Sequence, residues 1–137
     1  MGKAKFLGWG AYTTCGLGWS YRTRFFVFDL DKAKEAVKKL SNEKIKELIE
    51  RIEAFREWKD YHTRMCNTYD CQVVRAREGA LFEIGILREL GVKVEEVVVD
   101  TCWEDWKKLE EELDKLPDVV PSELVYDEAE KRGLLDP

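Results

Sequence analysis

The sequence contains no long hydrophobic run. Over its 137 residues, no apolar stretch approaches the roughly 20 residues that a transmembrane helix needs. The N-terminus also lacks the apolar core of a secretory signal peptide. These two absences argue against a membrane-spanning or exported protein. They predict a soluble, cytoplasmic protein with no membrane partner.

Recognised catalytic signatures are also missing. His62 is the only histidine, and no catalytic triad is recognisable. The pairs Gly8-x-Gly10 and Gly16-x-Gly18 do not form a phosphate-binding loop, because neither leads from a strand directly into a helix. The sequence therefore favours a non-catalytic protein over an enzyme, and no cofactor is expected.

Acidic residues are absent from the first 28 positions. This segment carries a formal charge of +4, whereas residues 102–137 carry −7 and the whole chain −5. Such asymmetry suggests an anionic partner for the basic end. The simpler interpretation is a basic sheet that rests against acidic helices of the same chain.

Charged residues are abundant. They make up 37% of the chain, against about 25% in an average protein, and many are Lys and Glu at helical spacing in 43–57 and 104–115. This pattern is typical of hyperthermophile proteins. In composition the chain resembles the uncharacterised small proteins of hyperthermophilic archaea and their viruses. The resemblance includes no motif, so it implies no activity and no site residue.

Hydrophobic periodicity outlines the secondary structure. Residues 3–30 predict a β-hairpin, because aromatic and β-branched residues dominate and Gly16 and Gly18 can supply the positive φ of a turn. Helical patterns follow over 31–40, 43–66 and 73–90. After Gly91, a strand is predicted over 92–100, with a bulge suggested by Glu96. The last predictions are a helix over 103–116 and a short one that begins near Ser122.

These elements predict one α+β domain over residues 1–137. The hairpin (3–30) joins the third strand in one antiparallel sheet, and the helices of 31–116 pack on one face of it. Residues 117–137 form a C-terminal tail with a short helix. For this tail, a docked segment and a frayed terminus are equally compatible with the sequence.

A carboxylate interrupts the apolar face of the predicted central helix. At about 100° per residue, Glu83 shares one face with Val73, Ala76, Gly79, Ala80, Ile84, Ile86, Leu87 and Leu90. Burial of an unpaired charge is costly, so a partner is expected, first His62 and then one of Arg22, Arg24, Arg64 or Arg75. The alternatives are a helix turned toward water, or a functional carboxylate whose pKa is raised by desolvation. Small neighbours either let another helix approach or leave room for a ligand.

The cysteines have two interpretations. His62, Cys66 and Cys71 spell His-x3-Cys-x4-Cys, which Cys15 or Cys102 would complete as a zinc site, but this is not an established spacing. Disulfides are favoured, because intracellular proteins of hyperthermophiles can carry them. A Cys66–Cys71 bridge would span a short loop, and a Cys15–Cys102 bridge would tie the hairpin tip to the last helices. Free buried thiols are the alternative, and His62 itself is more simply a core residue than a catalyst.

The predicted hairpin combines aromatic rings with guanidinium groups. Single-stranded nucleic acids stack on such surfaces. The simpler interpretation is that the rings form the core of the sheet or a dimer interface. The candidate partner-binding residues are Trp9, Tyr12, Trp19, Tyr21, Arg22 and Arg24.

Three functions are compatible with these features. The leading hypothesis is a non-catalytic binding or assembly protein that self-associates as a homodimer. The alternative is single-stranded nucleic-acid binding through the basic, aromatic hairpin. The third is an acid-dependent, metal-assisted hydrolase that uses Glu83, for which the sequence offers further acids at Asp70, Glu78, Glu95, Glu96 and Asp100.

Overall fold

The protein folds into a three-stranded sheet and a set of helices. The computed structural model describes residues 2–16 and 18–135. Within them the order of elements is β1 (Lys3–Cys15), β2 (Gly18–Asp29), α1 (Leu30–Lys38), α2 (Asn42–Met65), α3 (Tyr69–Glu89), β3 (Val94–Asp100), α4 (Trp106–Asp114) and α5 (Pro121–Lys131). The strands form one antiparallel sheet in the order β1-β2-β3. The predicted α+β class, with an N-terminal hairpin joined by one later strand, is confirmed.

The strand register has one irregularity, and it lies in β1. The β1–β2 pairing runs from Lys3 opposite Asp29 to Cys15 opposite Gly18, with a register shift between Leu7 and Gly10. The prediction of a bulge at Glu96 is wrong, because β3 pairs with β2 without interruption. Glu96 breaks the apolar alternation for a different reason, which is an ion pair with Arg24 on the neighbouring strand.

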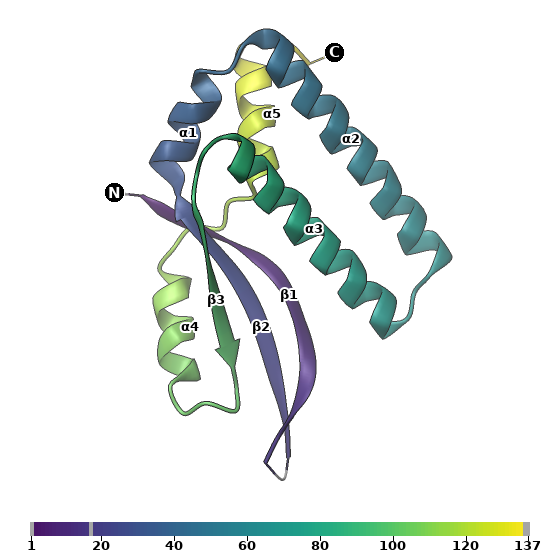
Figure 1. The fold of residues 1–137 in the computed structure, drawn as a ribbon, viewed down its shortest axis with the longest axis vertical. Coiled ribbons are helices and arrows are strands. Elements are labelled where there is room, and N and C mark those ends of the chain that lie inside the picture. Colours follow the sequence, from purple (N-terminus) through teal and green to yellow (C-terminus); the bar gives the residue numbers. More distant parts are fainter. Residues whose placement is uncertain (1, 17, 136–137) are drawn as a thin grey trace.

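The two faces of the sheet are covered by different helices. Phe6, Phe26 and Phe28 belong to the main core, which they share with α1, α2, α3 and α5 (Figure 1). Because successive side chains of a strand alternate between faces, Phe25 and Val27 point the other way. They pack in a second cluster with residues of β3 and of α4. Helices α1, α2, α3 and α5 therefore pack on one face of the sheet, and α4 packs on the other.

Side-chain caps set the starts of the first three helices. Asp29, Ser41 and Thr68 each accept a hydrogen bond from the backbone N–H three residues further on, which satisfies a donor that the helix leaves free. Because Thr68 is such a cap, α3 begins at Tyr69, four residues before the start of the helix predicted over 73–90. Gly91, with φ of 75°, follows its end.

The C-terminal helix is part of the core. Within α5, Val125 and Ala129 are fully buried, and the helix contacts α1, α2 and α3 (Figure 1). Of the two alternatives for the C-terminal tail, the structure shows the docked one over residues 117–135. No helix within the described ranges is long and apolar enough to cross a membrane.

Candidate functional site

Glu83 meets the N-terminus of α5. Its Oε1 accepts a hydrogen bond from the Ser122 backbone N–H at 2.7 Å, and its Oε2 accepts one from the Ser122 hydroxyl at 2.9 Å. The residue that precedes α5 is Val120, which cannot cap a helix with its side chain, and Pro121 has no N–H. Glu83 therefore supplies from α3 the cap that α5 lacks, and its negative charge lies at the positive end of the helix dipole.

The prediction of a specific partner for Glu83 is confirmed, but the predicted partner is wrong. Hydrogen bonds of Glu83 go to Ser122 and to none of His62, Arg22, Arg24, Arg64 or Arg75. The sequence could not indicate Ser122, because it lies 39 positions away in a segment whose docking was undecided. Both donors of Ser122 are neutral, so the Glu83 carboxylate has hydrogen bonds without a bonded cation.

Two of the predicted partners of Glu83 make other contacts. The His62 ring stacks on Trp58 with 5.1 Å between ring centroids, and its Nδ1 is buried without a hydrogen-bond partner. Arg75 is buried and donates to the Cys66 carbonyl at 2.8 Å. Neither residue is hydrogen-bonded to Glu83.

A cavity of about 350 Å³ adjoins Glu83 between α2, α3, β1 and the start of α5. Its wall contains aromatic and aliphatic side chains together with the small residues predicted around Glu83, so these small residues border open space, which was one of their two predicted roles. Charged side chains also line it, two of them cationic. The residues that matter here are Phe6, Ile52, Phe55, Arg56, Lys59, Ala76, Gly79, Ala80, Phe82, Glu83, Ser122 and Glu123.

The cavity perturbs the titration of Glu83. Desolvation raises the pKa of this carboxyl above its ordinary value, and the effect outweighs the opposing hydrogen bonds from Ser122 and the positive charge of Arg56. The described residues contain no group of three or more His, Cys, Asp or Glu placed to hold a metal ion. The geometry thus offers a carboxylate in a partly apolar cavity, without a surrounding ligand set for metal-assisted hydrolysis.

All four cysteines form disulfides. Cys15 is bonded to Cys102 and Cys66 to Cys71, with Cα–Cα separations of 5.7 and 5.9 Å. The preference for disulfide bonds is confirmed. Because Cys66 and Cys71 are bonded to each other, their sulfurs do not act with His62 as zinc ligands in this structure.

Aromatic side chains gather at the far end of the hairpin, where it projects beyond the sheet (Figure 1). Tyr12 contacts its cross-strand partner Tyr21 and also Tyr69 of α3, with ring centroids 5.0 and 6.0 Å apart. The Tyr69 hydroxyl accepts a hydrogen bond from the Tyr12 backbone N–H at 3.0 Å. Trp19 is 78% exposed, and the exposed Trp103 follows Cys102, which is tied to the hairpin. We call the contacting rings of Tyr12, Tyr21 and Tyr69, together with the exposed Trp19 and Trp103 of neighbouring chain segments, the hairpin-end cluster.

The guanidinium groups of the hairpin are neutralised within the chain. Arg22 pairs with the buried Asp100 at 3.0 Å. Arg24 pairs with Glu96 at 3.2 Å and lies over the partly buried ring of Trp9. Of the six predicted partner-binding residues, the structure brings the exposed rings of Tyr12 and Tyr21 into contact and leaves Trp19 exposed on the same strand as Tyr21, while Trp9 and Arg24 pack together elsewhere.

The remaining basic charge of β1 is also partly neutralised. Lys5 pairs with Asp118 at 2.9 Å, so a basic side chain of the N-terminal segment meets an acid of the C-terminal one. Together with the pairs of Arg22 and Arg24, this contact shows neutralisation within the chain, but the acids lie in β3 and between α4 and α5, and not on helices as the simpler interpretation of the charge asymmetry had it.

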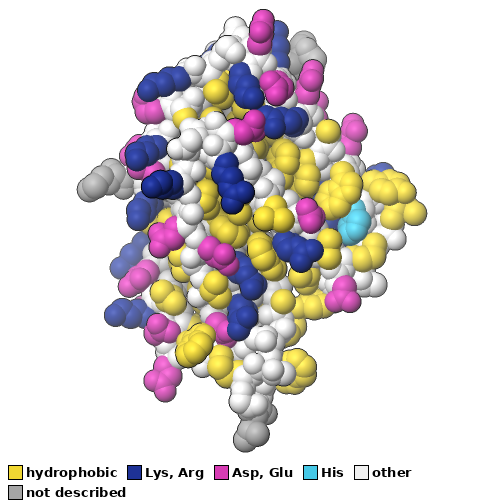
Figure 2. Space-filling view, viewed as in Figure 1, with side chains coloured by type: hydrophobic (Ala, Val, Ile, Leu, Met, Phe, Trp, Pro, Cys, Tyr) yellow, Lys and Arg dark blue, Asp and Glu magenta, His cyan; other side chains and the backbone are white. Residues whose placement is uncertain are grey.

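A second exposed hydrophobic surface lies on α2. Trp58, Tyr61 and Met65 are exposed and recur at spacings of three and four residues, so they share one face of the helix. Figure 2 shows hydrophobic side chains gathered around the histidine on this side of the molecule. This surface was not predicted from the sequence, although the helical spacing of its residues is a signal that could have revealed it.

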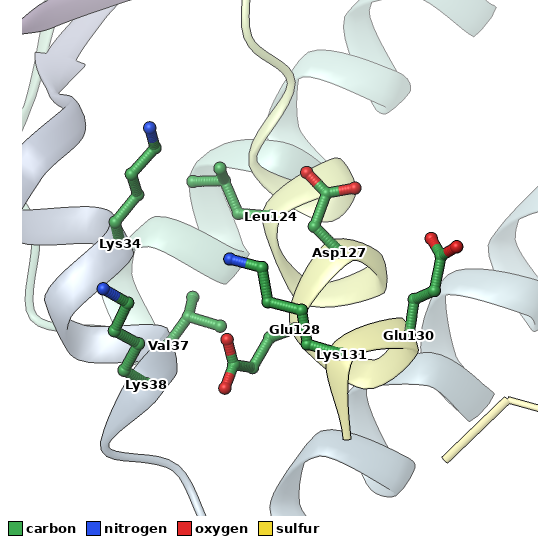
Figure 3. Close-up of a pocket in the computed structure, with 8 residues that line it drawn as sticks. All are labelled: Lys34, Val37, Lys38, Leu124, Asp127, Glu128, Glu130 and Lys131. Atoms are coloured by element: carbon green, nitrogen blue, oxygen red, sulfur yellow. The ribbon is translucent and has the colours of Figure 1, made fainter. Parts of the chain in front are cut away.

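A larger hollow between α1 and α5 is a charged groove. Its volume is about 650 Å³, and Figure 3 shows lysines and acids side by side around Val37 and Leu124. Three of its lining residues are lysines and three are acids, and Glu128 is already paired with Arg132 at 3.0 Å. Opposite charges in equal number are typical of a solvated helix–helix groove, so we do not assign a site to it.

Comparison of the chain with protein-family models, with curated proteins and with solved structures finds no significant match. The function must therefore be inferred from these contacts and cavities.

Proposed function

We propose that this protein is a non-catalytic binding protein that self-associates as a homodimer through the hairpin-end cluster. The observation that supports the proposal is the grouping of exposed aromatic rings at one end of the molecule. Contiguous exposed apolar surface commonly marks an interface, and aromatic residues are enriched in the centres of interfaces. Trp19, at 78% exposed, is the clearest example.

A second copy of the chain suits this surface better than a nucleic acid. The rings of Tyr12 and Tyr21 are uncharged, and the nearest guanidinium group, that of Arg22, is held by Asp100. Nucleic-acid binding draws much of its affinity from free cations that meet phosphates, whereas a neutral aromatic surface can pair with its own copy about a two-fold axis. Two disulfides tie the hairpin tip and the start of α3 to their neighbours. These segments therefore lose little conformational entropy when two copies of the chain associate.

Multi-angle light scattering and sedimentation velocity test the proposal. We expect a mass of about twice 16.1 kDa at micromolar concentration and above. The double substitution Tyr12→Thr/Trp19→Thr keeps residues that favour strands and should return the mass to that of a monomer. Tyr61→Gln removes a comparably exposed ring from α2 and should leave the dimer intact.

Two results would contradict the proposal. One is a monomeric mass for the wild-type protein at about 100 µM, a concentration that would fill even a weak interface. The other is tight binding of labelled single-stranded oligonucleotides that weakens steeply with salt and is lost in the double variant. That second result would support the nucleic-acid alternative instead.

A further inference from the structure

The Glu83 cavity combines features that the hairpin-end proposal does not use. Its volume of about 350 Å³ lies within the range of small-ligand sites, roughly 300–1,000 Å³. An added Cβ at Gly79 would meet no heavy atom within 4 Å, so the helix leaves space on this side. Such a cavity next to a part-buried acid is a place where a ligand can make both apolar and polar contacts.

The charges around the cavity are incompletely matched. Glu83 takes part in no ion pair of the described residues within 4.0 Å. Its oxygens accept only the two neutral donors of Ser122, so each oxygen keeps a free acceptor site. Lys59 lines the same cavity, is exposed, and has no ion pair among the described residues. Arg56, the other cation, instead lies over the ring of Tyr126 at 4.6 Å.

We propose that this cavity binds a free hydrophobic α-amino acid, with its ammonium group on Glu83, its carboxylate on Lys59 and its side chain against the apolar wall. A protonated amine would give Glu83 the cationic partner that it lacks. A carboxylate on the same molecule would meet Lys59, whose charge would otherwise repel a simple amine. The aromatic rings of Phe55 and Phe82, stacked 4.5 Å apart, form part of the wall that receives the side chain.

The perturbed titration of Glu83 agrees with this assignment. Burial raises the pKa of its carboxyl, which means that the ionised form is poorly stabilised in the empty cavity. An adjacent ammonium group would favour the ionised form and reverse that effect. Neither an apolar molecule nor a simple anion would do so.

Isothermal titration calorimetry with L-valine, L-leucine, L-isoleucine, L-methionine and L-phenylalanine tests the proposal. At least one should bind with a dissociation constant of about 1 mM or tighter. For the best ligand, the analogue without the amine and the analogue without the carboxylate should each bind at least about tenfold more weakly, because each loses a charge-assisted hydrogen bond. For leucine these analogues are 4-methylpentanoate and 3-methylbutylamine. Absence of binding by all five amino acids at about 10 mM overturns the proposal, as does equal binding of the analogues.

Matched variants locate the site. Gly79→Leu should fill the cavity and abolish binding, whereas Gly85→Leu should leave it unchanged, because Gly85 lies on the same helix but borders a different cavity. Lys59→Gln should weaken binding about threefold or more as an exposed charge is lost, and Lys46→Gln, on the same helix outside the cavity, should not. If Gly79→Leu does not fold, the exposed Lys59 still decides. Wild-type affinity in both Gly79→Leu and Lys59→Gln would place the ligand elsewhere and refute the assignment.

Discussion

Glu83 is a carboxylate on an otherwise apolar helix face, and its contact with α5 explains why it is found there. On an apolar helix face its charge is unfavourable, and yet it stabilises the start of α5, which has neither a capping side chain nor an N–H at Pro121. The two hydrogen bonds to Ser122 satisfy donors that would otherwise be left without partners in the core. The favourable interactions of Glu83 therefore come from a tertiary contact with α5 and not from α3, the helix in which it lies.

The stability of Glu83 variants should reflect this neutral partner. Glu83→Ala leaves the part-buried Ser122 N–H unsatisfied and should lower the free energy of unfolding by about 1–3 kcal/mol. Glu83→Gln keeps a carbonyl acceptor and removes an unfavourable charge, so it should change stability by less than about 1 kcal/mol. Urea denaturation of both variants beside wild type measures the difference. Equal stability of all three proteins would show that the contact with Ser122 contributes nothing.

The pKa of Glu83 also predicts a pH dependence. Because the folded-state pKa is raised from its ordinary value near 4.5, the folded state holds this proton more tightly than the unfolded state does. The contribution of Glu83 to stability is therefore largest below that value, and it declines as pH rises through the window up to the folded-state pKa. Carboxyls with lowered pKa values, such as Asp100 and Glu89, make the free energy of unfolding rise with pH. The effect of Glu83 is therefore isolated by comparing wild type with Glu83→Gln, in which those other carboxyls are unchanged.

The unfolding free energy of wild type minus that of Glu83→Gln should fall as pH rises through this window and be constant above it. Thermal or urea unfolding from pH 4 to pH 8 measures that difference. A difference that does not vary with pH would contradict the raised pKa.

At the level of the elements, glycine has different roles in α3 and in β1. Within α3, a Cβ at Gly79 would meet nothing within 4 Å, and the helix bears the entropic disadvantage of glycine without a steric reason. In β1, a Cβ at Gly8 would lie 2.9 Å from the Arg24 carbonyl oxygen and against the ring of Phe26. The absence of a side chain at Gly8 therefore allows the irregular part of β1 to approach β2 closely.

These roles predict opposite effects of the same substitution. Gly79→Ala should raise the free energy of unfolding by about 0.5–1 kcal/mol through helix propensity. Gly8→Ala should lower it by about 1–3 kcal/mol, because the backbone of β2 has to shift. Chemical denaturation of the two variants provides the measurement, and a stabilising Gly8→Ala would show that the strands separate at no cost.

At the level of the whole molecule, the two disulfides restrain the chain over very different distances. Cys15–Cys102 closes a loop with a sequence separation of 87 residues, and Cys66–Cys71 one of only 5. The first joins the hairpin tip to the segment between β3 and α4, and the second holds the turn between α2 and α3. In the chain-entropy picture, the longer loop restricts the unfolded state more.

We therefore expect Cys15→Ser/Cys102→Ser to lower the free energy of unfolding by about 4.5 kcal/mol, and Cys66→Ser/Cys71→Ser by about 2 kcal/mol. Paired serine substitutions leave no single reactive thiol. Urea denaturation gives the two values, and intact-mass measurement before and after reduction verifies the bridges. A larger loss for the short loop would show that native contacts, and not chain entropy, dominate.

Local pattern was sufficient to predict most of the elements. Alternation and turn residues identified the hairpin, and the 3.6-residue period identified the long helices, because both signals arise within a few neighbouring residues. The first turn of α3 was missed because its cap, Thr68, lies in a polar stretch that resembles a loop. The bulge was misplaced at Glu96 because alternation cannot distinguish an irregular strand from an exposed cross-strand ion pair.

The sequence by itself determined the α+β class and the anomalous position of Glu83, because each depends on residue type and short-range spacing, and its composition favoured disulfides without fixing them. Only the tertiary structure decided that Ser122 is the partner of Glu83, that a cavity adjoins them, and that Arg22 and Arg24 are neutralised by Asp100 and Glu96. These contacts join residues about 40 to 80 positions apart. No local propensity specifies such pairings, since they follow from how the hydrophobic faces of all the elements pack together.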